Sequence, residues 1–158
     1  MAEVLRIDGQ HGRASMYAQL FPQLQAMLTN ENDLIANLAN VSASLKEAFN
    51  FHWVGFYRVV DAELVLGPFQ GPVACTRIAR GRGVCGSAWQ RGATIVVPDV
   101  DLFPGHIACS SLSRSEIVVP YFNRQDEVAG VLDIDSDKPN DFSSIDQFWL
   151  EKITTLLR

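Results

Sequence analysis

The three cysteines are the residues of this chain best suited to covalent chemistry, and one of them lies in an unusual loop. Cys109 belongs to PGHIACSSLSRSEIVVP, residues 104–120, with His106 three positions before it and Glu116 seven positions after it. Loops carry a large share of binding and catalytic residues, and a cysteine thiolate is both a nucleophile and a metal ligand. From these surroundings alone, Cys109 is a buried thiol, a metal ligand or a nucleophile.

The other two cysteines lie upstream, in segments of different character. Cys75 stands near the start of the strand-like run ACTRIAR, and Cys85 stands between glycines in GRGVCGSA. Free cysteine is among the most frequently buried residue types, so core packing is the simplest interpretation of Cys75. The three cysteines and His106 would also make a Cys₃His zinc set. The chain has no CxxC pair and lacks the HxE and PCxxC pattern of zinc deaminases, so zinc stays an alternative without a motif behind it.

Two acids share a short stretch, GVLDIDSD, near the end of the chain. Asp133 and Asp135 are two positions apart, so on a strand both side chains point to one face. Carboxylates placed this way repel each other unless a cation or a shared proton intervenes. Pairing with SEIVVPYF would bring Glu116 close to them, and such a cluster would attract a cationic group and keep one acid protonated. A solvated face, a turn and a metal site are the other interpretations.

Length and composition limit the possible functions. The chain has 158 residues, 47% of them apolar and 20% charged, which is typical of one globular domain. Its net charge of −5 argues against nucleic-acid binding, and a cluster of arginines is interpreted as a solvated face: Arg77, Arg80, Arg82 and Arg91. No apolar run approaches the ~18 residues of a membrane span, and the start lacks a secretory pattern. We therefore expect a cytoplasmic protein with reduced thiols and no membrane partner.

Hydrophobic periodicity predicts helices near both ends and strands between them. Helices are expected over 16–30, where Pro22 marks a kink or the true start, and over 32–49, 81–92 and 143–158. Ser144 and Gln147 resemble a capping box for the last helix. Strands are expected over 52–60, 63–69, 74–80, 94–97, 115–122 and 128–135, with the first two and the last two forming hairpins. This order predicts an α+β domain over 15–158, behind a flexible arm over 1–14, with terminal helices covering one face of a mostly antiparallel sheet.

Several segments together resemble the free methionine-(R)-sulfoxide reductases, which are stand-alone GAF-domain enzymes. The matching segments follow one another in the order ANLANVSA, NFHWVGFYRV, LVLGPFQGPVACTRIARGRGVCGSA, VPDVDLFPGHIACSS, SRSEIVVP and GVLDIDSD, and cover nearly the whole chain from about Ser15. The resemblance implies a GAF-like fold with an antiparallel sheet of about six strands, and a homodimer. One position departs from the family pattern, because Ser110 stands where the family usually has an acidic residue.

The resemblance also implies roles for eight residues. Cys109 matches the catalytic cysteine, and Cys75 and Cys85 match candidate resolving cysteines. The acids that bind the substrate's sulfoxide oxygen and ammonium match Glu116, Asp133 and Asp135. The aromatics that enclose the methyl-sulfur end of the substrate match Trp53 and Tyr57. The substrate carboxylate is left to the arginines of TRIARGR, residues 76–82, or to loop amides.

The implied chemistry is a redox cycle without a metal or an organic cofactor. The Cys109 thiolate attacks the sulfoxide sulfur while a neutral carboxylic acid protonates the oxygen, and a sulfenic acid remains. A second cysteine converts the sulfenic acid to a disulfide, which thioredoxin reduces with electrons from NADPH. Acids facing an ammonium would favour free methionine sulfoxide over the peptide-bound form. The alternative from another class is a non-catalytic GAF sensor that binds a small ligand.

Overall fold

A six-stranded antiparallel sheet forms the centre of the molecule, which we describe from a computed structural model over residues 4–107 and 109–158. Its strands are β1 (Trp53–Val60), β2 (Glu63–Gln70), β3 (Arg77–Ala79), β4 (Ile95–Val97), β5 (Ser115–Phe122) and β6 (Val128–Ser136). They lie in the order β3-β2-β1-β6-β5-β4, and every neighbouring pair is antiparallel. The α+β class, the six strands and both hairpins are therefore confirmed.

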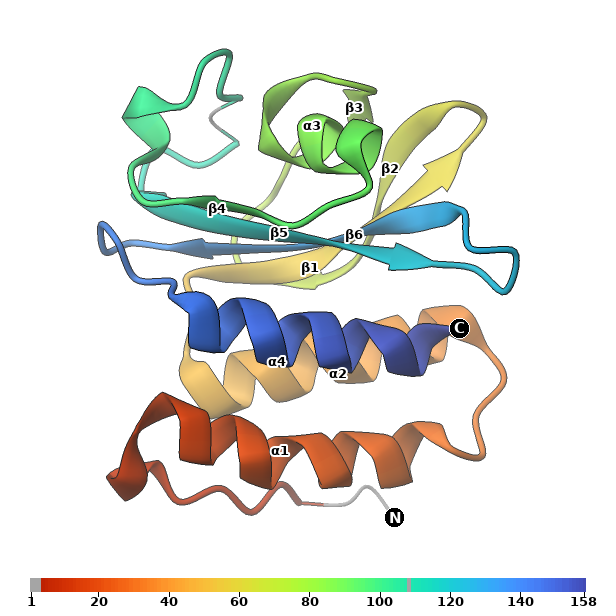
Figure 1. Cartoon of the computed structure of the whole chain (residues 1–158), viewed down its shortest axis with the longest axis vertical. Helices are drawn as coiled ribbons and strands as arrows, with labels where there is room; N and C mark the ends of the chain where they lie inside the picture. The colour runs from red at the N-terminus through yellow and green to blue at the C-terminus, as the bar shows by residue number, and fades with distance from the viewer. Residues whose placement is uncertain (1–3, 108) are drawn as a thin grey trace.

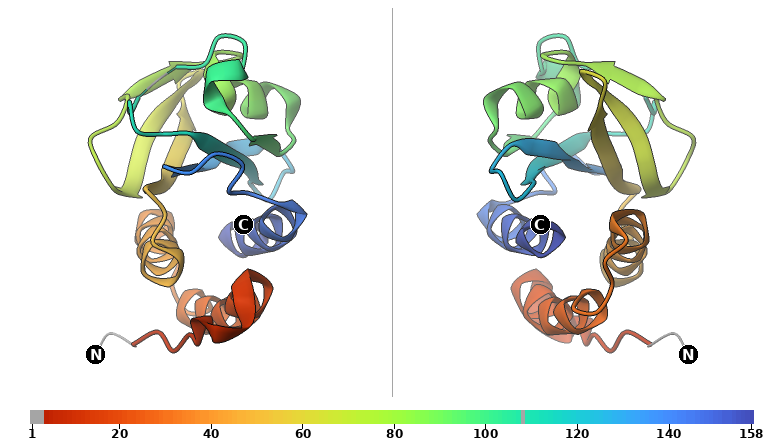
Figure 2. Two further views of the ribbon diagram at one scale, coloured as in Figure 1. Left: turned by 90° about the vertical axis from the view of Figure 1, so that its left-hand side faces the viewer. Right: turned by 90° about the vertical axis from the view of Figure 1, so that its right-hand side faces the viewer.

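Helices cover the two faces of this sheet unequally. Three helices form a layer on one face: α1 (Gly12–Leu28), α2 (Leu34–Phe49) and α4 (Ser144–Thr154). Figure 1 shows this layer below the sheet, and Figure 2 shows α2 and α4 next to the sheet with α1 beneath them. The short helix α3 (Gly83–Arg91) and the β4–β5 loop lie on the opposite face. Terminal helices on one face were expected from the sequence, and this arrangement is confirmed.

The alternation of side chains along the central strands gives each face its own core. Val54 and Phe56 of β1, Leu132 and Ile134 of β6, and Ile117 of β5 point towards the three-helix layer and belong to the larger core. A smaller core, which includes residues of β1 and α3, fills the opposite face. The larger core stabilises the sheet, and the second face can therefore carry polar groups.

Several helix ends differ from the expected ones, among them those of α1 and α4. Helix α1 begins at Gly12, inside the stretch expected as an arm, and Pro22 lies within the helix rather than at its start. Helix α4 is capped by Ser143, and its capping-box partner is Asp146, so the predicted pair, Ser144 and Gln147, was wrong by one residue. Both pairs satisfy the four-residue pattern in SSIDQ, and Asp146 fits because its carboxylate accepts the Ser143 backbone N–H at 2.8 Å.

Two short 3₁₀ turns flank the ends of the chain, η1 (Gly9–His11) and η3 (Thr155–Leu157), and a third, η2 (Val100–Leu102), opens the β4–β5 loop. Upstream of η1, the backbone N–H groups of Arg6 and Asp8 donate to glutamine side chains of α1, at 2.9 and 2.8 Å.

No helix in the described part of the chain is both long and apolar enough to span a bilayer.

At Gly130 the central strands approach too closely to leave room for a Cβ, which gives a test of the sheet. A Cβ there would overlap the Tyr57 carbonyl oxygen and lie 2.6 Å from the Tyr121 hydroxyl. We expect Gly130→Ala to lower the free energy of unfolding by about 1–3 kcal/mol, because the backbone must shift to admit the methyl group. Urea denaturation measures this effect.

Gly9→Ala is the matched control, because a Cβ at Gly9 meets nothing within 4 Å. Equal stability of the two variants would contradict the close approach.

Candidate active site

Strand register gathers the predicted acids and aromatics on the sheet face that α3 covers. Asp135 of β6 pairs with Trp53 of β1 on one side and with Glu116 of β5 on the other. Asp133 is two positions before Asp135, so it points the same way. Directly paired residues of antiparallel strands share a face, and the register therefore places three carboxyl groups side by side.

A single hollow lies between this face, helix α3 and the β4–β5 loop. Seven of the eight residues assigned by resemblance line it: Trp53, Tyr57, Cys85, Cys109, Glu116, Asp133 and Asp135. The eighth, Cys75, is joined to Cys109 by a disulfide whose Cα atoms are 5.6 Å apart. The structure thus brings all eight together from segments far apart in the sequence, while their roles stay predictions.

The disulfide joins residues of unequal exposure, 34 positions apart in the sequence. Cys109 is exposed and Cys75 is half-buried. The Tyr57 hydroxyl donates to the Cys75 carbonyl oxygen at 3.0 Å, which ties the Cys75 segment to β1. Because the two bonded sulfurs carry no thiolate, the Cys₃His zinc set is not available in this state. His106 lies 3.4 Å from the Glu116 carboxyl group instead.

Burial and mutual repulsion shift the titration of the acids. Glu116 and Asp133 are only 5% and 7% exposed. Burial raises the pKa of both carboxyl groups well above the usual range, and the charge of Asp135 adds to the shift. Burial also raises the pKa of Asp135, although Ser113, His52 and His106 oppose this shift. The raised pKa values therefore favour retention of a proton by the Glu116–Asp133 pair.

Cys85 is buried beside these acids rather than near the surface. Its Sγ, a Glu116 oxygen and an Asp133 oxygen all lie within 4.8 Å of one another. Burial, and then the charges of Asp133 and Glu116, raise the pKa of the Cys85 thiol well above its ordinary value. Cys85 is therefore a neutral thiol here, and a poor nucleophile. In geometry alone, these three side chains are also a candidate metal-binding group.

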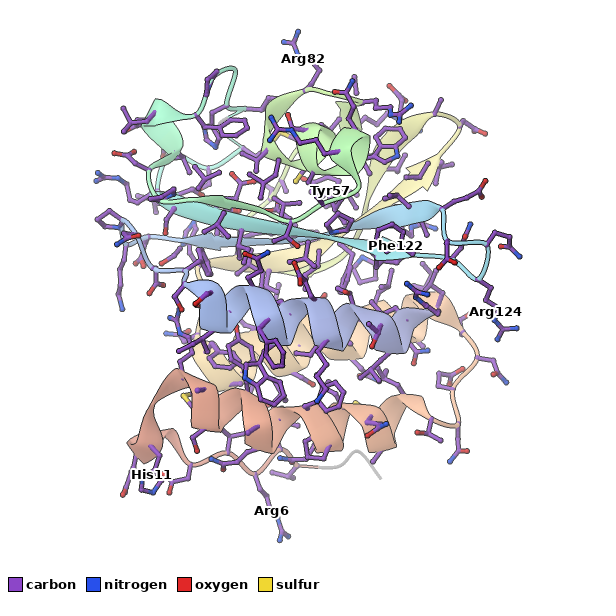
Figure 3. The ribbon with its side chains drawn as sticks, viewed as in Figure 1. Arg6, His11, Tyr57, Arg82, Phe122 and Arg124 are labelled. Atoms are coloured by element: carbon purple, nitrogen blue, oxygen red, sulfur yellow. A yellow bond between two sulfur atoms is a disulfide. The ribbon has the colours of Figure 1, made fainter. Side chains whose placement is uncertain are left out.

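The aromatic residues form one wall of the hollow. The Trp53 and Tyr57 rings are nearly parallel, with centroids 6.0 Å apart, and the Trp53 indole N–H donates to the Pro72 carbonyl oxygen. Gly55 lies between them in β1, and a Cβ there would stand 2.7 Å from the Trp53 ring. Figure 3 places Tyr57 between α3 and the sheet. Gly55 thus lets the indole ring lie flat along the strand, a role that the sequence analysis missed.

The arginine cluster divides into different environments. Arg77 pairs with Glu63 at 3.0 Å, and Arg80 lies over the Trp89 ring. Arg82 reaches the edge of the hollow, although Figure 3 shows its side chain extending into solvent. The first turn of α3 lines the hollow at Gly83, beside Arg82. Both candidate partners for a carboxylate, an arginine and backbone amides, therefore occur at one place.

Two polar contacts made by residues of the hollow had no signal in the sequence. His52 Nε2 lies 3.1 Å from the Ser110 hydroxyl. Ser110, which departs from the family pattern, is therefore hydrogen-bonded to the residue just before β1. Ser113 is buried next to Asp135. The family resemblance marks Ser110 as a departure, but nothing in the spacing of either serine predicts these contacts.

Comparisons with known proteins agree on one family. The GAF domain profile matches residues 33–157. GAF domain-containing protein A of Dictyostelium discoideum is 60% identical to this chain over 158 residues, and the match covers 99% of both chains. The free methionine-R-sulfoxide reductase of Escherichia coli is 43% identical, and that match covers 92% of this chain and 88% of the relative. The X-ray structure of free methionine-R-sulfoxide reductase from Neisseria meningitidis with its substrate superposes with a TM-score of 0.94 at 51% identity, covering 98% and 92%.

The raised pKa of Asp133 predicts a pH-dependent stability. As pH rises above about 4, the unfolded chain releases the Asp133 proton first, so the folded state loses stability until the folded-state carboxyl group also ionises. Asp133→Asn removes this loss. The variant's gain in free energy of unfolding over the parent should therefore be larger at pH 8 than at pH 5, by more than about 1 kcal/mol.

Urea denaturation at both pH values measures the difference, and Asp101→Asn, at an exposed carboxylate, is the control. A gain that is the same at both pH values would contradict the shared-proton cluster.

Proposed function

This chain belongs to the free methionine-R-sulfoxide reductases, a family of GAF domains, and on that premise we propose that it reduces free methionine (R)-sulfoxide to methionine. One observation carries the proposal: the exposed Cys109 and the acid cluster line the same hollow. The thiol supplies a nucleophile and the acids supply a proton, which are the two groups that sulfoxide reduction requires.

In the first half of the cycle, the Cys109 thiolate attacks the sulfoxide sulfur. The Glu116–Asp133 pair donates its proton to the sulfoxide oxygen, which weakens the sulfur–oxygen bond. The oxygen ends on Cys109 as a sulfenic acid, and methionine leaves with its sulfur reduced. Trp53 and Tyr57 enclose the methyl-sulfur end and limit the access of water.

In the second half, we assign Cys75 rather than Cys85 as the resolving cysteine. The Cys75 thiolate attacks the Cys109 sulfenic sulfur, and the sulfenic hydroxyl takes up a proton from solvent and leaves as water as the disulfide forms. The Cys75–Cys109 bond supports this choice, as does the neutral, buried state of Cys85. A thioredoxin-type dithiol, supplied with electrons by NADPH in the cytoplasm, then restores both thiols, so the cycle uses no metal or organic cofactor. The enzyme acts as a homodimer, as the family resemblance implies.

The acids also support selection for the free amino acid. We assign Asp135, with the ionised member of the Glu116–Asp133 pair, to the substrate ammonium, and the first turn of α3 with Arg82 to its carboxylate. An amide nitrogen in place of the ammonium would leave a partly buried negative charge without a partner. The second candidate function, a non-catalytic sensor, would bind the ligand without consuming reductant. Ligand binding alone does not require a disulfide beside the hollow.

The division of roles among the cysteines predicts three distinct phenotypes. Cys109→Ser should abolish reduction of free methionine (R)-sulfoxide while the fold is retained, because no nucleophile remains. Cys75→Ser should release one methionine per chain and then stop when thioredoxin is the reductant. Cys85→Ser should keep turning over. Thioredoxin-coupled NADPH oxidation and single-turnover methionine release measure these outcomes.

Circular dichroism is the control for folding of each variant. Normal turnover by Cys109→Ser would contradict the nucleophile, and a Cys85–Cys109 disulfide mapped after one turnover would contradict Cys75 as the resolving residue.

The charge argument predicts strong discrimination between free and N-acetylated substrate. We expect kcat/KM for N-acetylmethionine (R)-sulfoxide to be at least about 100-fold below that for the free amino acid, because a buried charge loses its partner. Asp135→Asn should lower kcat/KM for the free substrate and narrow this ratio. A parent enzyme that turns over both substrates equally would contradict the ammonium site.

A further inference from the structure

The disulfide lies where another protein can reach it. Cys109 is exposed, whereas Cys75 is half-buried and held through its carbonyl oxygen by Tyr57. Thiol–disulfide exchange requires a thiolate to approach one sulfur while the other leaves, so access decides which sulfur is attacked. Of the two, the exposed Cys109 offers an incoming thiolate the more open approach.

Three large apolar side chains are exposed on the two loops that carry the bonded cysteines. Val73 is 88% exposed and lies two residues before Cys75, and Leu112 is 62% exposed and lies three residues after Cys109. Leu102, 79% exposed, lies in η2. The Val100 backbone N–H donates to the Arg114 carbonyl oxygen at 3.0 Å, which joins the two ends of the β4–β5 loop. Leu102 follows Val100 by two residues and Leu112 precedes Arg114 by two, so both lie on this loop near its joined ends. Exposed apolar side chains on the loops that carry a reactive bond are suited to form an interaction surface.

We propose that these three residues, which we call the apolar rim (Val73, Leu102 and Leu112), form the docking surface for the dithiol protein that reduces the disulfide, and that its thiolate attacks Cys109. This inference rests on the proposed function, because only a catalytic disulfide needs repeated reduction. The partner is a thioredoxin-type protein whose reactive dithiol is surrounded by apolar surface.

The chemistry balances without a further reactant. The incoming thiolate forms a mixed disulfide with Cys109, and the Cys75–Cys109 bond breaks as Cys75 leaves as a thiolate. The second thiol of the partner then attacks the mixed disulfide, so Cys109 is released reduced and the partner is oxidised by two electrons. Cys75 accepts a proton from solvent.

The size of the rim suits this kind of encounter. Redox complexes are transient and bury less than about 1,200 Å² in total, so a few apolar anchors on the loops that carry the reactive bond provide enough contact. The exposed Phe148 lies on α4, in the three-helix layer on the other side of the sheet, and cannot take part in the same contact (Figure 1). Phe148 therefore provides a matched apolar control.

The first experiment compares two reductants on the double variant Leu102→Ser with Leu112→Ser, neither of which lines the hollow. With thioredoxin, the KM for thioredoxin should rise about tenfold, as expected when anchoring side chains are removed. With dithiothreitol, which needs no docking, kcat and the KM for sulfoxide should stay within about twofold of the parent. Phe148→Ser should behave as the parent with both reductants.

An unchanged KM for thioredoxin in the double variant would overturn the rim as a docking surface. Loss of turnover with dithiothreitol in the parent enzyme would instead contradict the proposed function, so the two failures are distinguishable.

The second experiment identifies the sulfur that is attacked. The parent enzyme is oxidised by one equivalent of methionine (R)-sulfoxide and mixed with a thioredoxin in which the second active-site cysteine is replaced by serine. Peptide mass mapping should find the trapped disulfide on Cys109, with Cys75 free. A mixed disulfide on Cys75 would overturn the assignment of Cys109 as the attacked sulfur.

Discussion

The arrangement of the site depends on the placement of like charges against one another on a protected sheet face. Glu116, Asp133 and Asp135 come from two neighbouring strands, and no lysine or arginine within residues 4–107 and 109–158 forms an ion pair with any of them. Removing such groups from water and bringing them together is costly, and the cluster lowers that cost by retaining a proton. The same repulsion between carboxylates favours binding of an ammonium group in the hollow, and the retained proton can be given to an oxygen.

The hydrophobic core offsets the unfavourable free energy of burying these acids. Leu132 and Ile134 alternate with the two aspartates along β6 and pack into the core between the sheet and the three-helix layer. One strand therefore contributes to the core on one face and to the acid cluster on the other. A slip of one residue in register would exchange the acids and the apolar side chains between faces, and for that reason the core fixes the position of the acids. Burial on one face therefore determines the chemistry on the other.

Sequence reasoning reached the parts of the site that local rules govern. The spacing of Asp133 and Asp135 fixes their shared face, and the polar turn over 123–127 implies the hairpin that brings Glu116 across from them. The Cys75–Cys109 pairing closes a separation of 34 residues through loops, and no periodicity reports such a contact. The capping box was misplaced because adjacent serines satisfy the same pattern, and only the backbone conformation distinguishes Ser143 as the cap.

The three cysteines show how environment divides one residue type among different tasks. Cys85 lies against the acids, where burial and negative charge keep its sulfur protonated. Cys109 stands at the mouth of the same hollow, exposed to solvent and bonded to a partner on the neighbouring loop. A thiolate at the position of Cys85 would add a further negative charge to the cluster, whereas a thiolate at the mouth of the hollow is stabilised by water. The electrostatics that prepare the acids therefore exclude the nearest thiol from attack and leave that reaction to the exposed one.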